Sequence, residues 1–289
     1  MTAAMVQREC GEVVANEHLG DGVFELVARL PHLAATTAAG QFAQLRCGDG
    51  CIPFLRRPFS VAWTQGDLCS FVLYPVGVGT RRLFELRPGD PLDVLGPLGH
   101  GFTLPVNASR ALCVAGGVGC APFPLLIRAL LNSGLNDITV LSGAMTADRL
   151  YPPERYRRNS VSDSGAEDAK LMVIEATDDG TRGHHGMITE LVETEMSRGG
   201  NIALYACGPN VMLAALARVL DVNGLRPALL EASFEAPMGC GFGTCLGCAL
   251  PVRRDGRTSW MLCCTEGPVM PLNAIDWEVL RERALTPVA

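Results

Sequence analysis

The sequence predicts a multidomain protein: an antiparallel β-barrel, then an α/β domain built on a parallel sheet, then a small cysteine-rich C-terminal domain. Three observations lead to this fold class. Short apolar runs separated by turn residues fill the first hundred positions, strand and helix patterns alternate from about residue 107, and five of the 12 cysteines fall within 25 residues near the C-terminus. Because 289 residues suffice for two or three compact units, we place the domains at residues 1–106, 107–226 and 227–289.

The barrel prediction rests on evenly spaced apolar runs, which are typical of short strands in a closed all-β domain. The runs cover residues 24–28, 41–45, 58–62, 70–74 and 91–95. Glycine, proline and aspartate stand between them, as they do in turns. One helix is expected over residues 80–86.

The middle of the chain alternates between the two kinds of element, which indicates a parallel sheet with ligands at the carboxyl ends of its strands. Strands are expected at residues 111–115, 138–141, 170–174 and 202–205, and helices at 121–131, 187–196 and 210–220. The polar, serine-rich segment 155–169 is expected to be an exposed loop. Beyond it, the C-terminal tail contains one amphipathic segment, 275–285.

Composition excludes several classes of protein. With 48% apolar and 19% charged residues, the chain is not intrinsically disordered. Its net charge of −6 comes from interspersed acids and bases, so nucleic acid is not an expected partner. The N-terminus lacks the order of a signal peptide, and the uncharged run 111–127, which no other run in the chain exceeds in length, is interrupted by glycine and proline. We therefore expect a soluble, cytoplasmic protein without a membrane span.

The clustered cysteines have the spacing C-x4-C-x2-C, formed by Cys240, Cys245 and Cys248, and the adjacent pair Cys263 and Cys264 follows. This is the plant-type spacing for a [2Fe–2S] cluster, in which one loop supplies three thiolates and a distant cysteine the fourth. Glycines in the loop allow backbone N–H groups to point at the sulfur atoms. A structural zinc site is the alternative, but zinc knuckles prefer two C-x2-C pairs and the chain has one.

Four shorter motifs fit the binding of nucleotides. The segment Arg57–Ser60 could hold a pyrophosphate and a flavin edge, with Phe59 as an apolar wall, although an arginine beside a proline can also be merely solvated. Gly77–Thr80 offers backbone N–H groups at a helix start, or is a plain turn with a threonine cap. Gly116–Pro122 is a glycine-rich strand-to-helix turn that permits close approach of a phosphate. Cys207–Pro209 marks a second strand end, where a buried structural cysteine is the alternative.

Together and in this order, the motifs resemble the ferredoxin–NADP⁺ reductase superfamily. The C-terminal cysteine loop narrows the resemblance to the electron-transfer subunits of NAD-linked (class 1B) dihydroorotate dehydrogenases. Further matches lie at residues 96–102, 177–189 and 264–269, so the resemblance covers the chain from about residue 5 to 270.

The resemblance implies three groups of site residues and no catalytic side chain. The FAD contacts would be Arg57, Pro58, Phe59, Ser60, Leu73, Tyr74, Pro75, Gly79 and Thr80; the NAD contacts would be Gly116, Gly117, Gly119, Pro122, Cys207, Gly208 and Pro209; the cluster ligands would be Cys240, Cys245, Cys248 and Cys264. Cys264 is chosen over Cys263 because the family's ligand stands three residues before the glycine of a Gly-Pro-Val turn. Pro75 stands where the family has an arginine, which puts one phosphate contact of the flavin in question.

The resemblance also implies a partner and a relay. An FMN-containing subunit would oxidise dihydroorotate in pyrimidine biosynthesis, in a heterotetramer with two copies of each chain. Electrons would pass singly through the cluster to FAD and then as a hydride to NAD⁺. NAD is favoured over NADP because residues 141–145 contain no arginine to bind a 2′-phosphate, although Arg149 is near.

Two other readings share this layout or its cofactors. The first is the small subunit of a bifurcating NADH-dependent ferredoxin–NADP⁺ oxidoreductase, or a hydrogenase γ-type subunit; the Cys245–Cys248 ending of the loop favours the dihydroorotate family over both. The second is a non-catalytic redox sensor, which would bind the cofactors without passing electrons from NADH to a dye.

Overall fold

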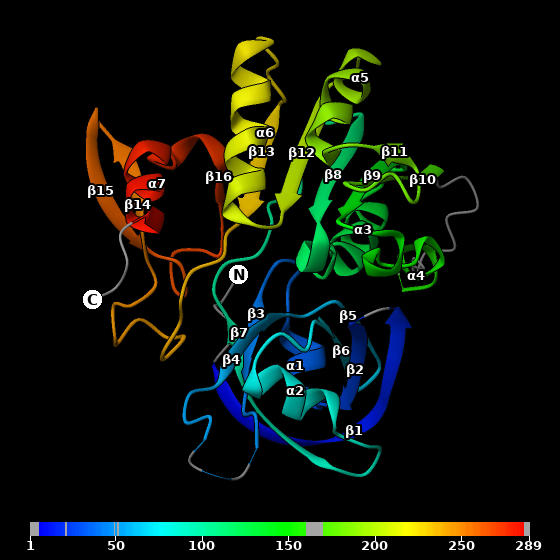
Figure 1. The fold of residues 1–289 in the computed structure, drawn as a ribbon, viewed down its shortest axis with the longest axis vertical. Coiled ribbons are helices and arrows are strands. Elements are labelled where there is room, and N and C mark those ends of the chain that lie inside the picture. Colours follow the sequence, from blue (N-terminus) through cyan, green and yellow to red (C-terminus); the bar gives the residue numbers. More distant parts are fainter. Residues whose placement is uncertain (1–5, 21, 49, 51, 160–169, 286–289) are drawn as a thin grey trace.

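The computed structural model describes residues 6–20, 22–48, 50, 52–159 and 170–285 (Figure 1). It contains a seven-stranded antiparallel sheet, a seven-stranded sheet that is mostly parallel, and a two-stranded hairpin. The predicted fold class is confirmed. Within the described ranges, no helix has both the length and the apolar character needed to cross a membrane.

The first sheet forms the barrel. Its strands are β1 (Gln7–Gly20), β2 (Val23–Arg29), β3 (Phe42–Leu45), β4 (Arg57–Ser60), β5 (Trp63–Gln65), β6 (Leu68–Leu73) and β7 (Pro91–Leu98), in the order β4-β3-β7-β1-β2-β6-β5. The segment 57–65 closes the barrel, because it contains both edge strands of the sheet: β4 pairs with β3 at one edge, and β5 pairs with β6 at the other. At the bend between them, Val61 N donates to Gln41 O at 3.2 Å and Ala62 N donates to Ser70 O at 2.8 Å.

All five predicted apolar runs of the barrel lie on strands, but β1 was not predicted. Its 14 residues are mostly polar, and Val13 is the only one that is buried. The strand is held by its backbone ladders to β2 and β7 rather than by an apolar face, so the sequence carries no alternation to reveal it. Two short helices accompany the barrel, α1 (Pro31–Thr36) and α2 (Val78–Phe84). The second starts two residues before the predicted 80–86.

The second sheet forms the α/β domain. Its strands are β8 (Arg110–Gly116), β9 (Asp137–Ala144), β10 (Lys170–Thr177), β11 (His184–His185), β12 (Ile202–Cys207), β13 (Leu229–Ser233) and β16 (Val269–Pro271), in the order β11-β10-β9-β8-β12-β13-β16. Its helices are α3 (Phe123–Asn132), α4 (Pro153–Asn159), α5 (Leu191–Ser197) and α6 (Asn210–Val222). The strand order reverses between β8 and β12, which is where ligands bind in open sheets of this kind.

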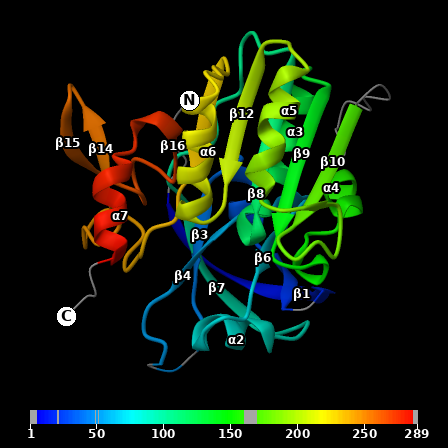
Figure 2. The ribbon, with the colours of Figure 1, turned by 45° about the horizontal axis from the view of Figure 1, so that its top comes forward.

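Helices cover both faces of this sheet (Figure 2). Leu126 of α3 belongs to the core that also includes the barrel interior, whereas Leu213 of α6 belongs to a second core on the other face. Alternate residues of β8 follow this division: Cys113 packs into the first core, and Leu112 and Val114 pack into the second. The barrel and the α/β domain therefore share one continuous apolar core.

The C-terminal segment is joined to the edge of the parallel sheet. The two strands that flank the cysteine loop, β13 and β16, pair antiparallel with each other, and both lie beyond residue 226, where we drew the domain boundary. The remaining elements are the hairpin β14 (Ala249–Arg254) and β15 (Arg257–Leu262), and the helix α7 (Trp277–Leu285), which lie outside β16 in Figure 1. Buried Asp276 connects them, because its carboxylate accepts from Thr258 Oγ1 at 2.7 Å and pairs with Arg253.

The prediction of an exposed loop over residues 155–169 is wrong at its start; residues 160–169 lie outside the described part of the chain. Pro153–Asn159 forms the helix α4, and the Arg155 side chain is only 14% exposed. Its guanidinium pairs with Glu17 and Glu25 of the barrel. The segment is polar in composition, which is typical of a loop. Its helix packs against α3 and pairs with the barrel, and these partners are distant in sequence.

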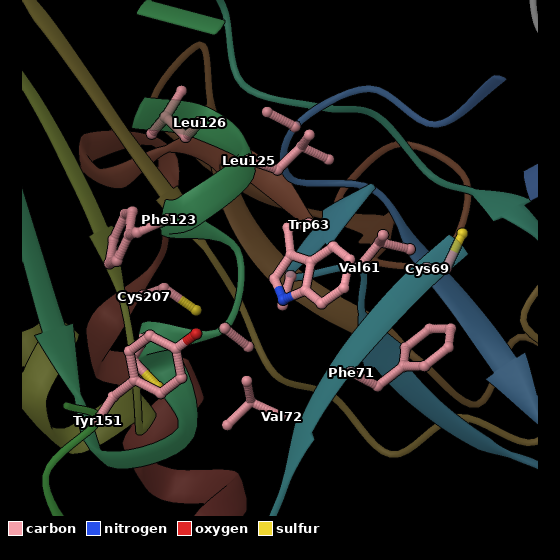
Figure 3. Packing of buried hydrophobic residues seen from close by; sticks show 14 of the residues in the cluster. Val61, Trp63, Cys69, Phe71, Val72, Phe123, Leu125, Leu126, Tyr151 and Cys207 are labelled. Atoms are coloured by element: carbon pink, nitrogen blue, oxygen red, sulfur yellow. The ribbon is translucent and has the colours of Figure 1, made fainter. Parts of the chain in front are cut away.

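Glu25 is the centre of a buried polar network at the junction between the barrel and the α/β domain. Two of its partners, Trp63 and Tyr151, are seen in Figure 3 among the buried apolar side chains. Its side chain is 1% exposed. Trp63 Nε1 donates to its Oε1 at 2.7 Å and Ser70 Oγ donates to the same oxygen at 2.8 Å. From the other domain, Tyr151 OH donates at 3.3 Å and the Arg155 guanidinium neutralises the charge. The network stabilises one relative placement of the two domains.

We predict that Arg155→Met lowers the free energy of unfolding by about 3 kcal/mol, because it leaves the Glu25 carboxylate buried without its cation. Urea unfolding followed by tryptophan fluorescence measures this, since Trp63 is part of the network. Arg157→Met is the control: Arg157 is exposed on the same helix, so its effect should stay within about 0.5 kcal/mol. Equal losses in the two variants would contradict the role of the network.

Candidate functional site

A cavity of about 320 Å³ lies between the barrel and the α/β domain. Its lining is mostly apolar and comes from β3, β4, β6, the start of α2 and the ends of β12 and β13. Five of the predicted FAD residues line it: Pro58, Phe59, Ser60, Tyr74 and Thr80. A mostly apolar cavity with a few polar groups on its lining fits the ring system of a flavin.

The other predicted FAD residues do not line this cavity. Leu73 is fully buried in the barrel core, and Pro75 follows Tyr74 at the end of the strand. Gly79 packs on Arg57: a Cβ added at Gly79 would lie 3.4 Å from Arg57 Cγ. The stem of Arg57 therefore lies against the first turn of α2, which brings together the two groups expected to hold a pyrophosphate.

Thr80 has a structural role besides lining the cavity. Its Oγ1 accepts from Gly77 N at 2.9 Å, as a threonine cap does. This bond satisfies one of the backbone donors at the start of α2 and accounts for the helix beginning before the predicted position.

A second cavity, of about 490 Å³, opens at the carboxyl ends of the parallel strands. Gly116, Gly117 and Pro209 of the predicted NAD residues line it. Gly117 has φ +55°, a conformation that favours glycine, so this turn exposes its backbone to the cavity. Tyr74 lines both cavities, as do Val118 and Glu235. The two cavities are therefore adjacent.

The remaining predicted NAD residues lie elsewhere. Gly119 and Cys207 line the first cavity, while Pro122 and Gly208 line neither. The two strand ends are in backbone contact, because a Cβ added at Gly119 would lie 2.2 Å from Cys207 O. Burial raises the pKa of the Cys207 thiol to about 12, so it is uncharged at neutral pH.

Sequence reasoning missed several residues of both cavities. In the first cavity they include Phe42, Val72, Ser233, Glu235, Met238 and Pro268; in the second they include Gly143, Ala144, Met145, Asp178, Met187, Ile188 and Thr189. Arg149, which the sequence indicated as near the nucleotide, also lines the second cavity. The residues after β9 and β10 could have been found from the rule that ligands meet strand carboxyl ends. Those of the first cavity come from segments far apart in sequence and carry no local signal.

The cysteine loop is built around its sulfur atoms. Gly243 N donates to Cys264 Sγ at 3.2 Å, Cys245 N donates to Cys240 Sγ at 3.4 Å, and Cys264 N donates to Cys248 Sγ at 3.4 Å. Gly241 and Gly243 have φ values of +85° and +88°, which the inward turn of this loop requires.

These backbone donors act on the cysteines differently. At Cys240, partial burial disfavours the thiolate, but the N–H groups of Cys245 and Phe242 outweigh it and lower the pKa to about 6. At Cys264, burial and the neighbouring Cys248 thiol raise the pKa to about 12, and a bound metal would remove that proton. Within the described residues, no three histidine, cysteine or acidic side chains converge as ligands of a single ion. Sulfur acceptors surrounded by N–H groups fit an iron–sulfur cluster.

The adjacent cysteines point in different directions. Cys263 is fully buried, and its thiol donates to Phe234 O at 3.4 Å, away from the loop. Cys264 Sγ instead accepts from Gly243, inside the loop. This arrangement favours Cys264 as the fourth ligand.

Comparison with protein families gives two matches. Residues 235–276 match the iron–sulfur cluster binding domain of dihydroorotate dehydrogenase B, and residues 113–218 match the oxidoreductase NAD-binding domain. The electron transfer subunit of dihydroorotate dehydrogenase B (NAD(+)) from Desulforamulus reducens is 36% identical over 86% of this chain and 90% of its own length. That from Geobacillus thermodenitrificans is 36% identical over 92% and 97%.

The chain belongs to the family of dihydroorotate dehydrogenase B electron transfer subunits. The predicted resemblance is thereby confirmed. Among solved structures, an NADH-dependent reduced ferredoxin–NADP oxidoreductase matches with a TM-score of 0.75 and 27% identity, over 94% of this chain and 92% of that one. A ferredoxin–NADP⁺ reductase from Neisseria gonorrhoeae shares the fold, with a TM-score of 0.61 and 16% identity over 75% of this chain and 92% of the other.

We predict that Cys264→Ser loses the cluster, whereas Cys263→Ser keeps it at a packing cost of about 1 kcal/mol. The two residues are adjacent and equally buried, so each variant is the matched control for the other. Iron and acid-labile sulfide content after anaerobic purification measure the outcome. Retained iron in Cys264→Ser together with lost iron in Cys263→Ser would reverse the assignment.

Proposed function

We propose that this chain carries electrons between an FMN-containing catalytic subunit, which oxidises dihydroorotate, and NAD⁺. Its cofactors are a [2Fe–2S] cluster held by Cys240, Cys245, Cys248 and Cys264, FAD in the first cavity, and NAD in the second. The assembly is a heterotetramer with two copies of each chain, active in pyrimidine biosynthesis.

This proposal rests on one observation: the first cavity adjoins both the cysteine loop and the second cavity. Met238, which lines the first cavity, lies two residues before Cys240. Pro268, on the same lining, lies four residues after Cys264. At the other end, Tyr74 and Glu235 belong to both cavities. A flavin in the first cavity would therefore lie next to both the cluster and the nicotinamide site.

FAD, when bound, accepts electrons one at a time from the cluster and delivers two to the nicotinamide as a hydride. The chain's own residues would bind the flavin and orient it. Phe59 and Tyr74 supply aromatic surface, and Ser60 supplies a hydroxyl at the cavity edge. Arg57 and the first turn of α2 supply charge and backbone N–H groups for the pyrophosphate.

The second cavity fits NAD. The glycine turn after β8 allows close approach of the nucleotide's phosphates, and Asp178 provides a carboxylate at the end of β10. Arg149 lies beside Met145 on the lining, with its Nη1 3.8 Å from Met145 Sδ, and provides a cation for the nucleotide's phosphates. Two relatives that match most of the chain are named for NAD(+), and on that ground we assign NAD rather than NADP as the physiological nucleotide.

Part of the cysteine loop lies at the protein surface. Cys245 is exposed, and two apolar side chains of the same loop, Phe242 and Leu246, are 50% and 64% exposed. Exposed apolar groups beside an electron carrier fit a protein partner. We propose a cytoplasmic location, supported by the eleven described cysteines, which are all free thiols.

A second candidate function is that of the small subunit of a bifurcating NADH-dependent ferredoxin–NADP⁺ oxidoreductase. The solved structure of that type, with its TM-score of 0.75, favours it as the alternative. Purification from the native source separates the two: an FMN-containing, dihydroorotate-oxidising partner supports our proposal, and a large ferredoxin-linked partner supports the alternative.

We predict that the isolated chain, reconstituted with FAD, iron and sulfide, reduces an artificial dye with NADH but does not oxidise dihydroorotate. The reason is that the hydride step needs only the two cavities, while dihydroorotate oxidation belongs to the partner. Spectrophotometric turnover with each substrate measures this. Cys264→Ser should retain NADH–dye activity and lose partner-dependent reduction of NAD⁺.

Two outcomes would contradict the proposal. Dihydroorotate turnover by the chain alone would place the catalytic site here. Bound FAD and cluster without any NADH–dye activity would instead indicate a redox sensor.

A further inference from the structure

Gln44 of β3 is a buried amide whose polar atoms are unpaired. Its side chain is 0% exposed, and neither Nε2 nor Oε1 has a hydrogen-bond partner among the described residues. Leaving such a group buried and unpaired costs about 1–3 kcal/mol. The amide therefore indicates a partner that the protein's own atoms do not supply.

The side chain lies on the outer face of the barrel, toward the cysteine loop. Residues on β3 alternate between two cores: Ala43 and Leu45 pack inside the barrel, and Phe42 packs in the second core with Cys248 and Cys264. Since side chains two apart on a strand share a face, Gln44 lies on the side of Phe42.

A direct contact places the Gln44 amide beside a cluster ligand. A Cβ added at Gly241 would lie 2.7 Å from both Cγ and Nε2 of Gln44. Gly241 follows Cys240 and has φ +85°, so only a residue without a side chain fits between the amide and the loop backbone. The amide nitrogen thus lies against the loop backbone at Gly241, next to Cys240, the first of the predicted cluster ligands.

We propose that Gln44 donates a hydrogen bond from Nε2 to a sulfur atom of the [2Fe–2S] centre, and thereby raises its reduction potential. The inference rests on the proposed function, because it needs the cluster in the loop. Donors to sulfur favour the reduced, more negative cluster. Phe42, on the same face, lines the first cavity and packs in one core with Cys248 and Cys264, so the Gln44 amide lies on the face of β3 that contacts both the cavity and the cysteine loop.

The reconstituted holo-chain allows a direct test by redox titration monitored with electron paramagnetic resonance. Gln44→Met keeps the volume and removes the donor, so the midpoint potential of the cluster should become more negative. Gln44→Glu replaces the donor by a carboxylate and should lower it further. Gln44→His restores a donor and should return the potential toward that of the unchanged chain.

A spectroscopic signature separates this role from packing. In ²H₂O, pulsed resonance of the reduced cluster should show an exchangeable deuteron that is absent from Gln44→Met. Gln65→Met is the control, since Gln65 is exposed on β5 of the same barrel and its variant should change neither readout.

Potentials in Gln44→Met and Gln44→Glu equal to that of the unchanged chain would overturn the proposal. If Gln44→Met fails to retain iron, the exchangeable deuteron decides: its presence in the unchanged chain and in Gln44→His but not in Gln44→Glu supports the bond, and equal deuteron signals in all three refute it. Absence of iron and sulfide from the unchanged chain would instead refute the proposed function.

Discussion

The shared apolar core of the barrel and the α/β domain is the constraint on which the site depends. Both cavities lie along this junction, and each is completed by residues of both units, such as Tyr74 from the barrel side and Val118 from the sheet side. The buried Glu25 network fixes the same junction with directional bonds. A rotation of one domain against the other would separate the residues that line the first cavity, so the packing of the two domains sets the geometry of the candidate site.

The cysteines near the first cavity and those of the cysteine loop differ in how readily they carry negative charge. Cys207 and Cys120, near the first cavity, have pKa values raised by burial and remain neutral, whereas the backbone N–H groups of the loop lower the pKa of Cys240 and so favour its thiolate. The neutral thiols beside the first cavity and the N–H donors in the cysteine loop therefore favour added negative charge on the loop's sulfur atoms rather than on those thiols.

Much of the fold and part of the site could be predicted because their signals are local. The spacing of Cys240, Cys245 and Cys248, and the glycines after β8, are short motifs whose geometry follows from a single segment. The strand β1, the helix α4 and the cavity residue Glu235 could not be predicted, because their placement depends on partners distant in sequence. Gln44 is the clearest case: in the sequence it is one polar residue in a strand, and only the approach of Gly241 shows where its amide lies.

The return of the chain to the sheet after the cysteine loop has a consequence for assembly. Ser233 and Val269 pair in the ladder between β13 and β16. The 35 residues between them, which include the cysteine loop and the hairpin, are therefore closed at their base by main-chain bonds. Closing a flexible segment of that length costs about 3 kcal/mol in chain entropy. The main-chain bonds at the sheet edge offset that cost, so the fold itself, and not only a bound metal, holds the ends of the cysteine loop together.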